Sequence, residues 1–295
     1  MRVAVTGASG LVGSAVARHL EGAGHEVVRV RRGRSDDRAD WNPAVGWFRA
    51  GALDGVDAVV HVAGLSVAGG RWTPAFRERL RASRVDATRL LVDHLAALPH
   101  PPRVFVAASA IGYYGDRGGE ALTEGSPRGG GFLAGLVRDW EQASLGGEQA
   151  GMRTVVFRFG HVLSAQGGVL GPMLPLFRLG LGGRFGSGRQ SFSWVAIDDL
   201  VRAVDFALAE EVRGVFNLTA PEPVTNAEFT RALGRALRRP AWLPVPGFVL
   251  RLVLGPGADE LLLWGQRVLP ERLLVAGFEF RYPRLGAALD AVLRG

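Results

Sequence analysis

The glycine-rich turn near the N-terminus constrains the fold more than any other part of this sequence. A short β-branched run, residues 2–6, leads directly into a turn with glycines at positions 7, 10 and 13. This spacing is typical of a βα turn that binds a dinucleotide: the first glycine allows a tight turn, the second lets the backbone approach a pyrophosphate, and the third lets the helix pack closely on the strand. The phosphates then lie at the helix N-terminus.

The residues after the turn favour a nucleotide site over the alternative of an ordinary glycine-rich loop. An apolar stripe of Val12, Ala15, Val16 and Leu20 predicts a helix that starts within the glycine motif. We therefore expect a strand, a turn and a helix whose backbone holds a dinucleotide. The predicted contact residues in this unit are Gly7, Ser9, Gly10, Leu11, Val12 and Gly13.

The end of the second predicted strand, residues 26–32, bears on which dinucleotide is bound. In a βαβ unit this strand end lies beside the adenosine ribose, where an acidic residue accepts hydrogen bonds from the 2′-hydroxyl of NAD. This chain has Arg31 and Arg32 there, with Arg34 close behind. Guanidinium groups suit a 2′-phosphate, so we predict NADP(H) as the cofactor. The alternative is that these arginines only cover a solvated loop.

Composition excludes several function classes. The chain of 295 residues has no cysteine, which rules out disulfides, thiolate catalysis and cysteine metal sites. All 35 basic residues are arginine, so no lysine takes part in any mechanism. No apolar run reaches about eighteen residues and no signal-peptide pattern is present, so we expect a cytoplasmic protein without a membrane partner. The net charge of +7 is scattered along the chain, which argues against nucleic-acid binding.

Two further predicted strands end in residues suited to a ligand site. The apolar run of residues 56–64 is typical of a strand buried on both faces of a parallel sheet, and we expect His61 within it to be a core residue without chemistry. Another predicted strand, residues 103–109, ends at the carboxyl edge of the sheet, where open α/β sheets bind ligands. The predicted site residues at these two strand ends are Val62, Ala63 and Gly64 for the cofactor, and Ser109, Tyr113 and Tyr114 for catalysis.

The alternation of strands and helices predicts an α/β fold: a Rossmann-type doubly wound parallel sheet of about six or seven strands with a smaller C-terminal substrate lobe. The expected cofactor domain covers residues 1–164 and about 190–215. The expected substrate lobe and C-terminal extension cover residues 165–189 and 216–295. We expect a small-molecule substrate and no metal. The sequence leaves open whether the protein forms a homodimer.

The order of the motifs resembles the extended short-chain dehydrogenase/reductases, the branch that contains nucleotide-sugar epimerases and dehydratases. The quoted residues are Thr6 to Gly13, His61 to Gly64, Ser109 with Tyr113 and Gly115, Arg158-x-Gly160, and Val195 to Asp199. More narrowly, the chain is similar to an epimerase-like group of that branch with its own C-terminal extension. That second resemblance rests on residues 71–73, Ser83-Arg84, Gly112-Tyr-Tyr-Gly115, Trp140-Glu141 and residues 173–183.

The resemblance implies catalytic roles, and this chain departs from two of them. In the extended enzymes a Ser or Thr matching Ser109 hydrogen-bonds the reacting oxygen, and a Tyr with a Lys four residues later transfers its proton. Phe132 and Leu136 occupy those last two positions here, and neither transfers a proton. Tyr113 or Tyr114 therefore becomes the candidate proton donor.

The chain also departs from the family pattern at Arg84, which stands where the family usually has Asn. Its guanidinium would reach a phosphate of the cofactor, which supports NADP(H). The alternative is a surface arginine with a buried aliphatic stem.

Two function classes follow from this sequence. As an enzyme, the protein would use NADP(H) to reduce, oxidise or epimerise a carbonyl or sugar-like small molecule. As a binding protein, it would sense NADP(H) without turnover, which the missing Tyr and Lys pair would allow.

Overall fold

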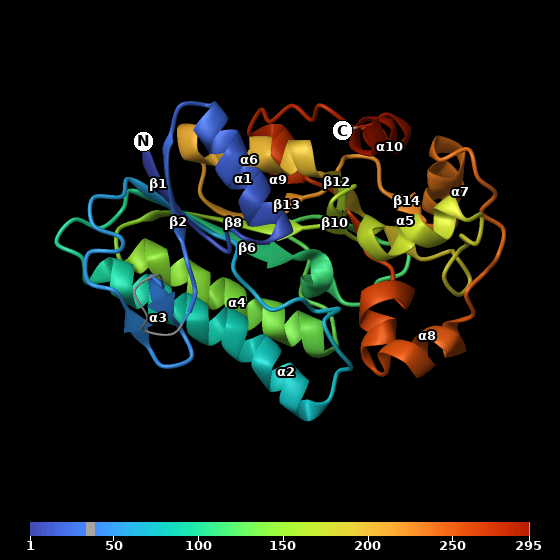
Figure 1. Cartoon of the computed structure of the whole chain (residues 1–295), viewed down its shortest axis with the longest axis horizontal. Coiled ribbons are helices and arrows are strands. Elements are labelled where there is room, and N and C mark those ends of the chain that lie inside the picture. The colour runs from blue at the N-terminus through green and yellow to red at the C-terminus, as the bar shows by residue number, and fades with distance from the viewer. Residues whose placement is uncertain (34–38, 295) are drawn as a thin grey trace.

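A six-stranded parallel sheet forms the centre of the computed structural model, which describes residues 1–33 and 39–294 (Figure 1). The predicted contact Arg34 lies outside the described residues. The strand order is β13-β8-β6-β5-β1-β2, so the chain leaves β1 toward one edge of the sheet and later continues from β5 toward the other. The strands are β1 (Arg2–Thr6), β2 (Glu26–Val30), β5 (Ala58–His61), β6 (Val104–Ala110), β8 (Arg153–Phe159) and β13 (Gly214–Leu218).

Helices cover both faces of this sheet, which confirms the doubly wound α/β fold predicted from the sequence (Figure 1). On one face lie α1 (Leu11–Gly22), α6 (Ile197–Ala209) and α9 (Glu271–Val275), and on the other lie α2 (Pro74–Arg81), α3 (Ala87–Ala96) and α4 (Phe132–Gln149). Because both faces are covered, all four residues of β5 and every residue of β6 but the last are buried. This explains why these strands are continuous apolar runs rather than alternating ones.

The segment between residues 73 and 98 is one kinked helical stretch. Thr73 caps α2 by accepting a hydrogen bond from the Phe76 amide, and Pro74 occupies the first helical position. A π-helical turn, Ala82–Asp86, joins α2 to α3. Such turns add a residue to the helix and often occur at functional sites.

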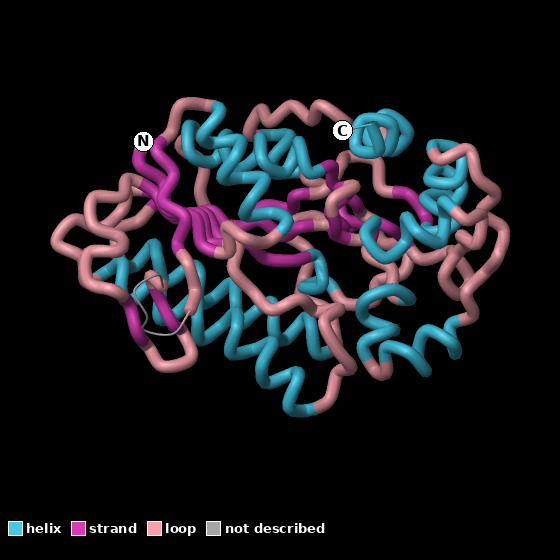
Figure 2. The backbone as a smooth tube through the Cα atoms, viewed as in Figure 1, coloured by secondary structure: helices cyan, strands magenta, loops and turns pink. Residues whose placement is uncertain are grey.

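Smaller elements gather at the end of the molecule opposite β1 and β2 (Figure 2). They include a three-stranded sheet of β9 (His161–Ser164), β10 (Gly167–Gly168) and β12 (Trp194–Ala196). The helices there are α5 (Leu170–Arg178), α7 (Asn226–Ala236), α8 (Gly247–Leu254) and α10 (Leu285–Arg294). The remaining strands are short pairs: β3 (Trp41–Asn42) with β4 (Trp47–Phe48), β7 (Ala121–Leu122) with β15 (Arg267–Val268), and β11 (Ser191–Phe192) with β14 (Val224–Thr225).

The strand β13 bears on the expected lobes. It pairs along its whole length with β8, from Gly214 opposite Val155 to Leu218 opposite Phe159. The boundary expected near residue 215 therefore falls inside a strand of the central sheet. The hydrogen bonds of the sheet, which sequence composition does not reveal, extend the part of the chain that belongs to the central sheet a few residues beyond that boundary.

The C-terminal extension is bound to the cofactor domain by buried polar contacts. The Asp199 carboxylate at the start of α6 accepts hydrogen bonds from the Arg281 and Tyr282 amides, at 2.7 and 2.9 Å. The Glu260 carboxylate caps α4 by accepting from the Phe132 and Leu133 amides, at 3.0 and 2.7 Å. The Glu260 contacts satisfy helix amides that would otherwise lack partners.

Two histidines, the buried His61 and the half-buried His161, give the fold a pH dependence. His61 is fully buried, with its ring nitrogens 2.7 Å from the Thr6 hydroxyl and 2.9 Å from the Thr88 hydroxyl, so it is the core residue that the sequence indicated. His161 stacks on Phe192 with ring centroids 4.2 Å apart. Burial lowers the pKa of each histidine to about 4.

We predict that the free energy of unfolding falls as the pH is lowered from about 7 to about 4. In that window the unfolded chain, with an ordinary histidine pKa near 6.5, binds more protons than the native protein. Each histidine therefore contributes stability that is complete above about pH 6.5 and lost toward pH 4, by up to about 3 kcal/mol. Urea unfolding at about pH 5 and about pH 7.5 measures the difference.

His161→Phe, which preserves the stacking surface, should reduce this pH dependence by roughly one proton. The matched control is a substitution at the exposed His100, which should leave it unchanged. A slope that is the same in wild type and His161→Phe would contradict the assignment.

Candidate cofactor and active site

Close backbone contacts shape the glycine turn. Gly7 has a φ of +69°, and a Cβ at this position would lie 2.9 Å from the Ala63 Cα. A Cβ on Gly13 would lie 2.2 Å from the Gly7 carbonyl oxygen. Any larger side chain would therefore push α1 off the turn and the turn off the end of β5.

The start of α1 has free backbone donors. Gly10 precedes the helix, no side chain caps it, and the first turn contains no acidic residue. The amides of Leu11, Val12 and Gly13 thus point out of the helix without an intrahelical partner. Together with the close-packed glycines, this arrangement fits a pyrophosphate.

A cavity of about 740 Å³ opens beside this turn, at the carboxyl ends of the neighbouring strands β1 and β5. That place is the switch point of the sheet, where open α/β folds bind ligands. The structure brings eight of the predicted contact residues into its lining: Gly7, Ser9, Gly10, Arg31, Arg32, Val62, Ala63 and Gly64.

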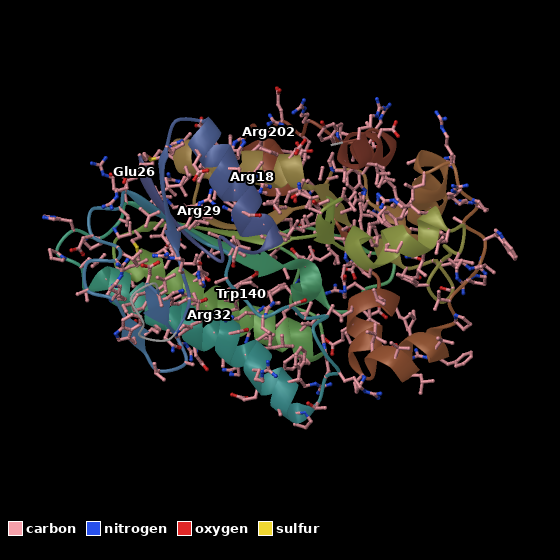
Figure 3. All side chains as sticks on the ribbon, viewed as in Figure 1. Arg18, Glu26, Arg29, Arg32, Trp140 and Arg202 are labelled. Carbon is pink, nitrogen blue, oxygen red and sulfur yellow. The ribbon has the colours of Figure 1, made fainter. Side chains whose placement is uncertain are left out.

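Arginines surround the expected adenosine end of this cavity. Arg29 and Arg32, both labelled in Figure 3, come from β2 and the residues that follow it. Arg29 is paired with Glu21 at 2.8 Å. Within residues 1–33 and 39–294, no carboxylate lies within 4.0 Å of the Arg32 guanidinium, so its charge is available to a ligand.

Sequence reasoning missed one acidic residue at this end of the cavity. The buried Asp40 carboxylate accepts a hydrogen bond from the Arg31 amide at 2.8 Å and lies 3.5 Å from the Arg31 side chain. It also pairs with Arg49. Asp40 lies ten residues after β2 rather than at its end, so the usual sequence spacing did not reveal it.

Arg84 lies in the π-helical turn and faces the same strand end as the cavity. Its guanidinium carbon is 3.4 Å from where a Cβ on Gly64 would be, and lies 5.2 Å from the centre of the Trp140 ring. Burial lowers the pKa of Arg84 to about 10, which still leaves it charged at neutral pH. A Cβ at position 64 would be in ordinary van der Waals contact with this guanidinium, so the arginine packs directly over the chain after β5.

A buried network surrounds Ser109 at the carboxyl end of β6. The Ser109 hydroxyl donates to the Glu141 carboxylate, with 2.6 Å between Oγ and Oε1. Arg158 on β8 donates to both oxygens of the same carboxylate, at 2.7 and 2.8 Å. Because its proton is held by Glu141, the Ser109 oxygen has only lone pairs to offer a ligand.

Tyr114 is part of this network and is fully buried. Its hydroxyl accepts from Arg158 at 2.9 Å and lies 2.7 Å from the Asn217 side-chain oxygen and 2.9 Å from the Thr123 carbonyl. Burial raises the pKa of Tyr114, and the Arg158 charge opposes that shift only in part. Its hydroxyl is therefore committed to protein partners.

Tyr113 differs from its neighbour. It is half-buried, and the guanidinium carbon of Arg158 lies 3.5 Å from the centre of its ring. The two tyrosine rings meet edge to face at 5.4 Å. In the described part of the chain no hydrogen bond occupies the Tyr113 hydroxyl, so Tyr113 is the tyrosine whose hydroxyl is available to a ligand.

The arginine of this network keeps its charge despite its burial. Burial opposes the charge of Arg158, but its hydrogen bonds and attraction to Glu141 more than offset this and raise its pKa. A bidentate pair with both carboxylate oxygens satisfied is the arrangement in which a buried ion pair persists.

Sequence reasoning did not identify Glu141, Arg158 and Asn217 as partners. Glu141 and Arg158 stood in quoted motifs, but nothing in their spacing indicated that they pair across helix and strand. The positions of the missing Tyr and Lys are apolar: Leu136 is buried, and the half-buried Phe132 contacts the Trp72 ring edge to face.

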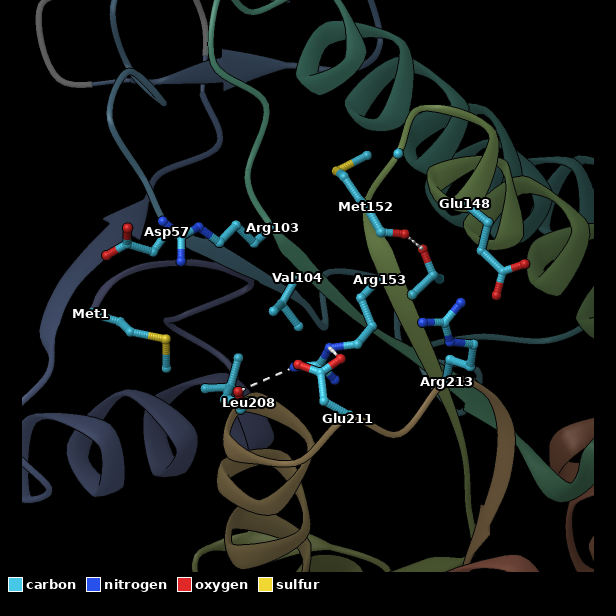
Figure 4. A pocket seen from close by; sticks show the side chains of 12 residues that line it. Met1, Asp57, Arg103, Val104, Glu148, Met152, Arg153, Leu208, Glu211 and Arg213 are labelled. Carbon is cyan, nitrogen blue, oxygen red and sulfur yellow. Dashed lines mark hydrogen bonds and ion pairs between the residues drawn. The ribbon is translucent and has the colours of Figure 1, made fainter.

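A second cavity, of about 840 Å³, opens at the amino ends of the strands (Figure 4). Asp57, Arg103, Arg153 and Arg213 are among its lining residues. Arg153 donates to carbonyls at the end of α6, including those of Ala207 and Leu208. Because ligands of such sheets bind at the opposite edge, we assign this cavity no role.

Residues 1–33 and 39–294 contain no cluster of three or more potential metal-binding side chains and no helix with the length and apolar character needed to span a bilayer.

Comparison with known proteins places the fold and site in context. The sequence profile of the NAD-dependent epimerase/dehydratase family matches residues 3–219, and that of a domain of unknown function, DUF1731, matches residues 245–292. An epimerase family protein of Mycobacterium tuberculosis is 46% identical over 290 residues, covering 97% of this chain and 96% of the relative. Human epimerase family protein SDR39U1 is 40% identical over 298 residues, covering 99% of this chain and 100% of the relative.

Solved structures agree with this assignment. The crystal structure of human SDR39U1 with NADPH superposes with a TM-score of 0.90 at 37% identity, covering 100% of both chains. A nucleoside-diphosphate sugar epimerase from Corynebacterium glutamicum gives a TM-score of 0.80 at 37% identity, covering 99% of this chain and 58% of that one. The matched profile, the relatives and the shared sheet together show that this chain belongs to the NAD-dependent epimerase/dehydratase family, with a DUF1731 domain at its C-terminal end.

Proposed function

We propose that this protein binds NADP(H) and uses it to reduce, oxidise or epimerise a carbonyl or sugar-like small molecule. The observation that carries the proposal is the cavity at the β1/β5 switch point, with the guanidinium groups of Arg31 and Arg32 at its adenosine end. The NADPH bound to the human relative supports the same cofactor. Residues 1–164 and about 190–215 would bind it, and the remaining segments would cover the substrate.

Arginine contacts would select the phosphorylated cofactor. Arg31 and Arg32 line the cavity where an acidic residue would otherwise bind the ribose of NAD, and among the residues that the structure describes Asp40 is occupied by Arg31 and Arg49. Arg84 would add a contact to a cofactor phosphate beside Gly64. Leu11, Val12 and Gly13 would contribute backbone amides to the pyrophosphate.

At the active site, Ser109 and Tyr113 would hold the reacting oxygen of the substrate. The bound cofactor would supply or accept the hydride. Because Glu141 holds the Ser109 proton, Ser109 would accept a hydrogen bond from a substrate hydroxyl, while the Tyr113 phenol would transfer the proton. Arg158, directly against the Tyr113 ring, would stabilise negative charge that develops there.

A second function rests on a specific observation. The helix that carries the Tyr and Lys pair in the extended family has Phe132 and the buried Leu136 at those positions here. An NADP(H) sensor without turnover would need neither residue. A panel of aldehydes, ketones and nucleotide sugars with NADPH separates the two functions, because only the enzyme consumes reduced nicotinamide.

Arg32→Ala should weaken NADPH binding about tenfold or more, since a charge-assisted contact to phosphate contributes roughly 1.5–3 kcal/mol. Binding of NADH, which lacks the 2′-phosphate, should change little. Calorimetry with both dinucleotides measures the preference. The exposed Arg103, which lies outside the cavity beside the glycine turn, provides the matched Arg→Ala control. Equal affinity of the wild type for NADPH and NADH would refute the proposed selection.

Tyr113→Phe should lower the rate on a verified substrate by about 10²–10⁴-fold if its phenol transfers the proton, whereas Ser109→Ala, which removes one hydrogen-bond acceptor, should lower it by about tenfold or less. A hydroxyl that merely lines the pocket would cost about tenfold or less. Stopped-flow or steady-state consumption of NADPH distinguishes these ranges. A rate within about tenfold of wild type for Tyr113→Phe would show that another group carries the proton.

Tyr114→Phe tests the neighbouring tyrosine, whose catalytic role stays a prediction. Removing a hydroxyl with buried partners should lower the free energy of unfolding by about 1–3 kcal/mol, because Asn217 and Arg158 lose a partner. Denaturant unfolding measures this loss. A rate decrease as large as that of Tyr113→Phe, with unchanged stability, would instead make Tyr114 the proton donor.

A further inference from the structure

Large apolar side chains are exposed at the end of the molecule that carries α5 and α7 (Figure 1). Trp242 is 71% exposed, Leu179 72% and Leu181 50%. Their loops run side by side: the Leu243 amide donates to the Gly182 carbonyl at 3.1 Å, and the Val245 amide to the Arg184 carbonyl at 2.9 Å. These apolar residues therefore belong to neighbouring segments.

Arginines surround these exposed apolar residues. Trp242 lines two adjoining surface hollows together with Arg184 and the arginines of α7 and its C-terminal turn. None of these side chains forms an ion pair with any residue that the structure describes. We call this surface the distal basic face; it consists of Leu179, Leu181, Trp242, Arg178, Arg184, Arg231, Arg235, Arg238 and Arg239, all exposed.

The excess of basic over acidic residues in the whole chain does not by itself explain the positive charge of this face. The chain has 28 acidic residues, yet residues 149–197 and 229–258, the two segments that build the face, contain none. An arginine-rich composition alone would leave carboxylates interspersed, as they are elsewhere on the surface. The residues of this face therefore carry positive charge without carboxylates among them.

Arg238 adds an independent observation. It is the only residue other than glycine with positive φ, at 55°, in the described chain. Glycine is the usual residue at such a position after a helix, and a larger side chain there is strained. The chain thus places an arginine on this face at a position where the backbone favours glycine.

The combination of charges and apolar groups favours one class of partner. A second copy packed symmetrically on this face would bring the arginines of both copies together without a carboxylate between them. Nucleic acid would satisfy the arginines but not the exposed leucines. An anionic bilayer satisfies both, because its headgroups attract arginine while tryptophan and leucine enter the interfacial region.

We propose that the distal basic face docks on a membrane surface rich in anionic lipid, as a peripheral contact without a spanning segment. Helix α8, which follows Trp242 in the chain, adds exposed apolar groups at the same end of the molecule (Figure 1): Phe248 is 69% exposed and Leu252 71%. The proposal does not depend on the proposed function. It departs from the sequence-based expectation of no membrane partner, which rested on the lack of a long apolar segment.

Flotation with vesicles tests it on the full-length protein. The wild type should bind vesicles of phosphatidylcholine with about one-third phosphatidylglycerol, and not vesicles of phosphatidylcholine alone. Reversing two charges in Arg238→Glu/Arg239→Glu should lower the partition coefficient about tenfold or more. Trp242→Ala should lower it several-fold, and raising the salt should weaken wild-type binding.

Arg103→Glu/Arg213→Glu provides the matched control. It makes the same change in net charge with two exposed arginines that line the cavity at the amino edge of the sheet. This control should bind anionic vesicles as the wild type does. Thermal melting and NADPH binding should be unchanged in every variant, which shows that each is folded.

Several results would overturn the proposal. These are absence of binding to the anionic vesicles, equal binding to neutral ones, or equal losses in the control and the Arg238→Glu/Arg239→Glu variant. Binding of duplex DNA or RNA that depends on Arg238 and Arg239, without vesicle binding, would identify a nucleic-acid face. Dimers in light scattering that Trp242→Ala dissociates, again without vesicle binding, would identify a face between copies.

Discussion

The buried ion pair between Glu141 and Arg158 holds the carboxyl edge of the sheet together. It connects helix α4 to strand β8, orients Ser109 on β6, and anchors Tyr114, which in turn contacts Asn217 on β13. Removing two charges from water is costly, and the pair persists because both carboxylate oxygens and most guanidinium donors have partners. The geometry of every polar group beside the expected substrate depends on this one contact.

The C-terminal extension reinforces the same edge from outside. Glu260 caps α4, Gln266 donates to the Gly115 carbonyl at 2.9 Å, and the Asn217 side chain donates to the Leu269 carbonyl at 3.0 Å. The loop that carries Tyr113 is thus held on its inner side by the ion pair and on its outer side by the C-terminal extension. At the positions where the family resemblance puts a Tyr and Lys pair, this chain has Phe132 and Leu136 on α4.

Arginine serves three distinct physical roles in a chain without lysine. Buried and paired, Arg158 organises the active-site edge; half-buried and unpaired, Arg84 lies beside the end of β5; exposed and unpaired, the arginines of the distal basic face create a positive surface. Burial and the position of carboxylates separate these roles. A guanidinium keeps its charge in all three settings, so arginine can fill each of these roles in a chain without lysine.

The sequence by itself determined the local structure around the glycine turn and most of the lining of the cavity beside it. Glycine spacing, apolar runs and the Arg31-Arg32 pair are short-range signals, and they predicted β1, α1, β2 and the lining of the cavity because backbone sterics act between neighbouring residues. Only the tertiary structure decided that Tyr114 is buried while Tyr113 is accessible, that Glu141 holds the Ser109 proton, and that Asp40 lies beside Arg31. It also brought two acid-free segments together around Trp242. Each of these depends on contacts between residues distant in sequence, and no local pattern encodes which long-range partner a side chain meets.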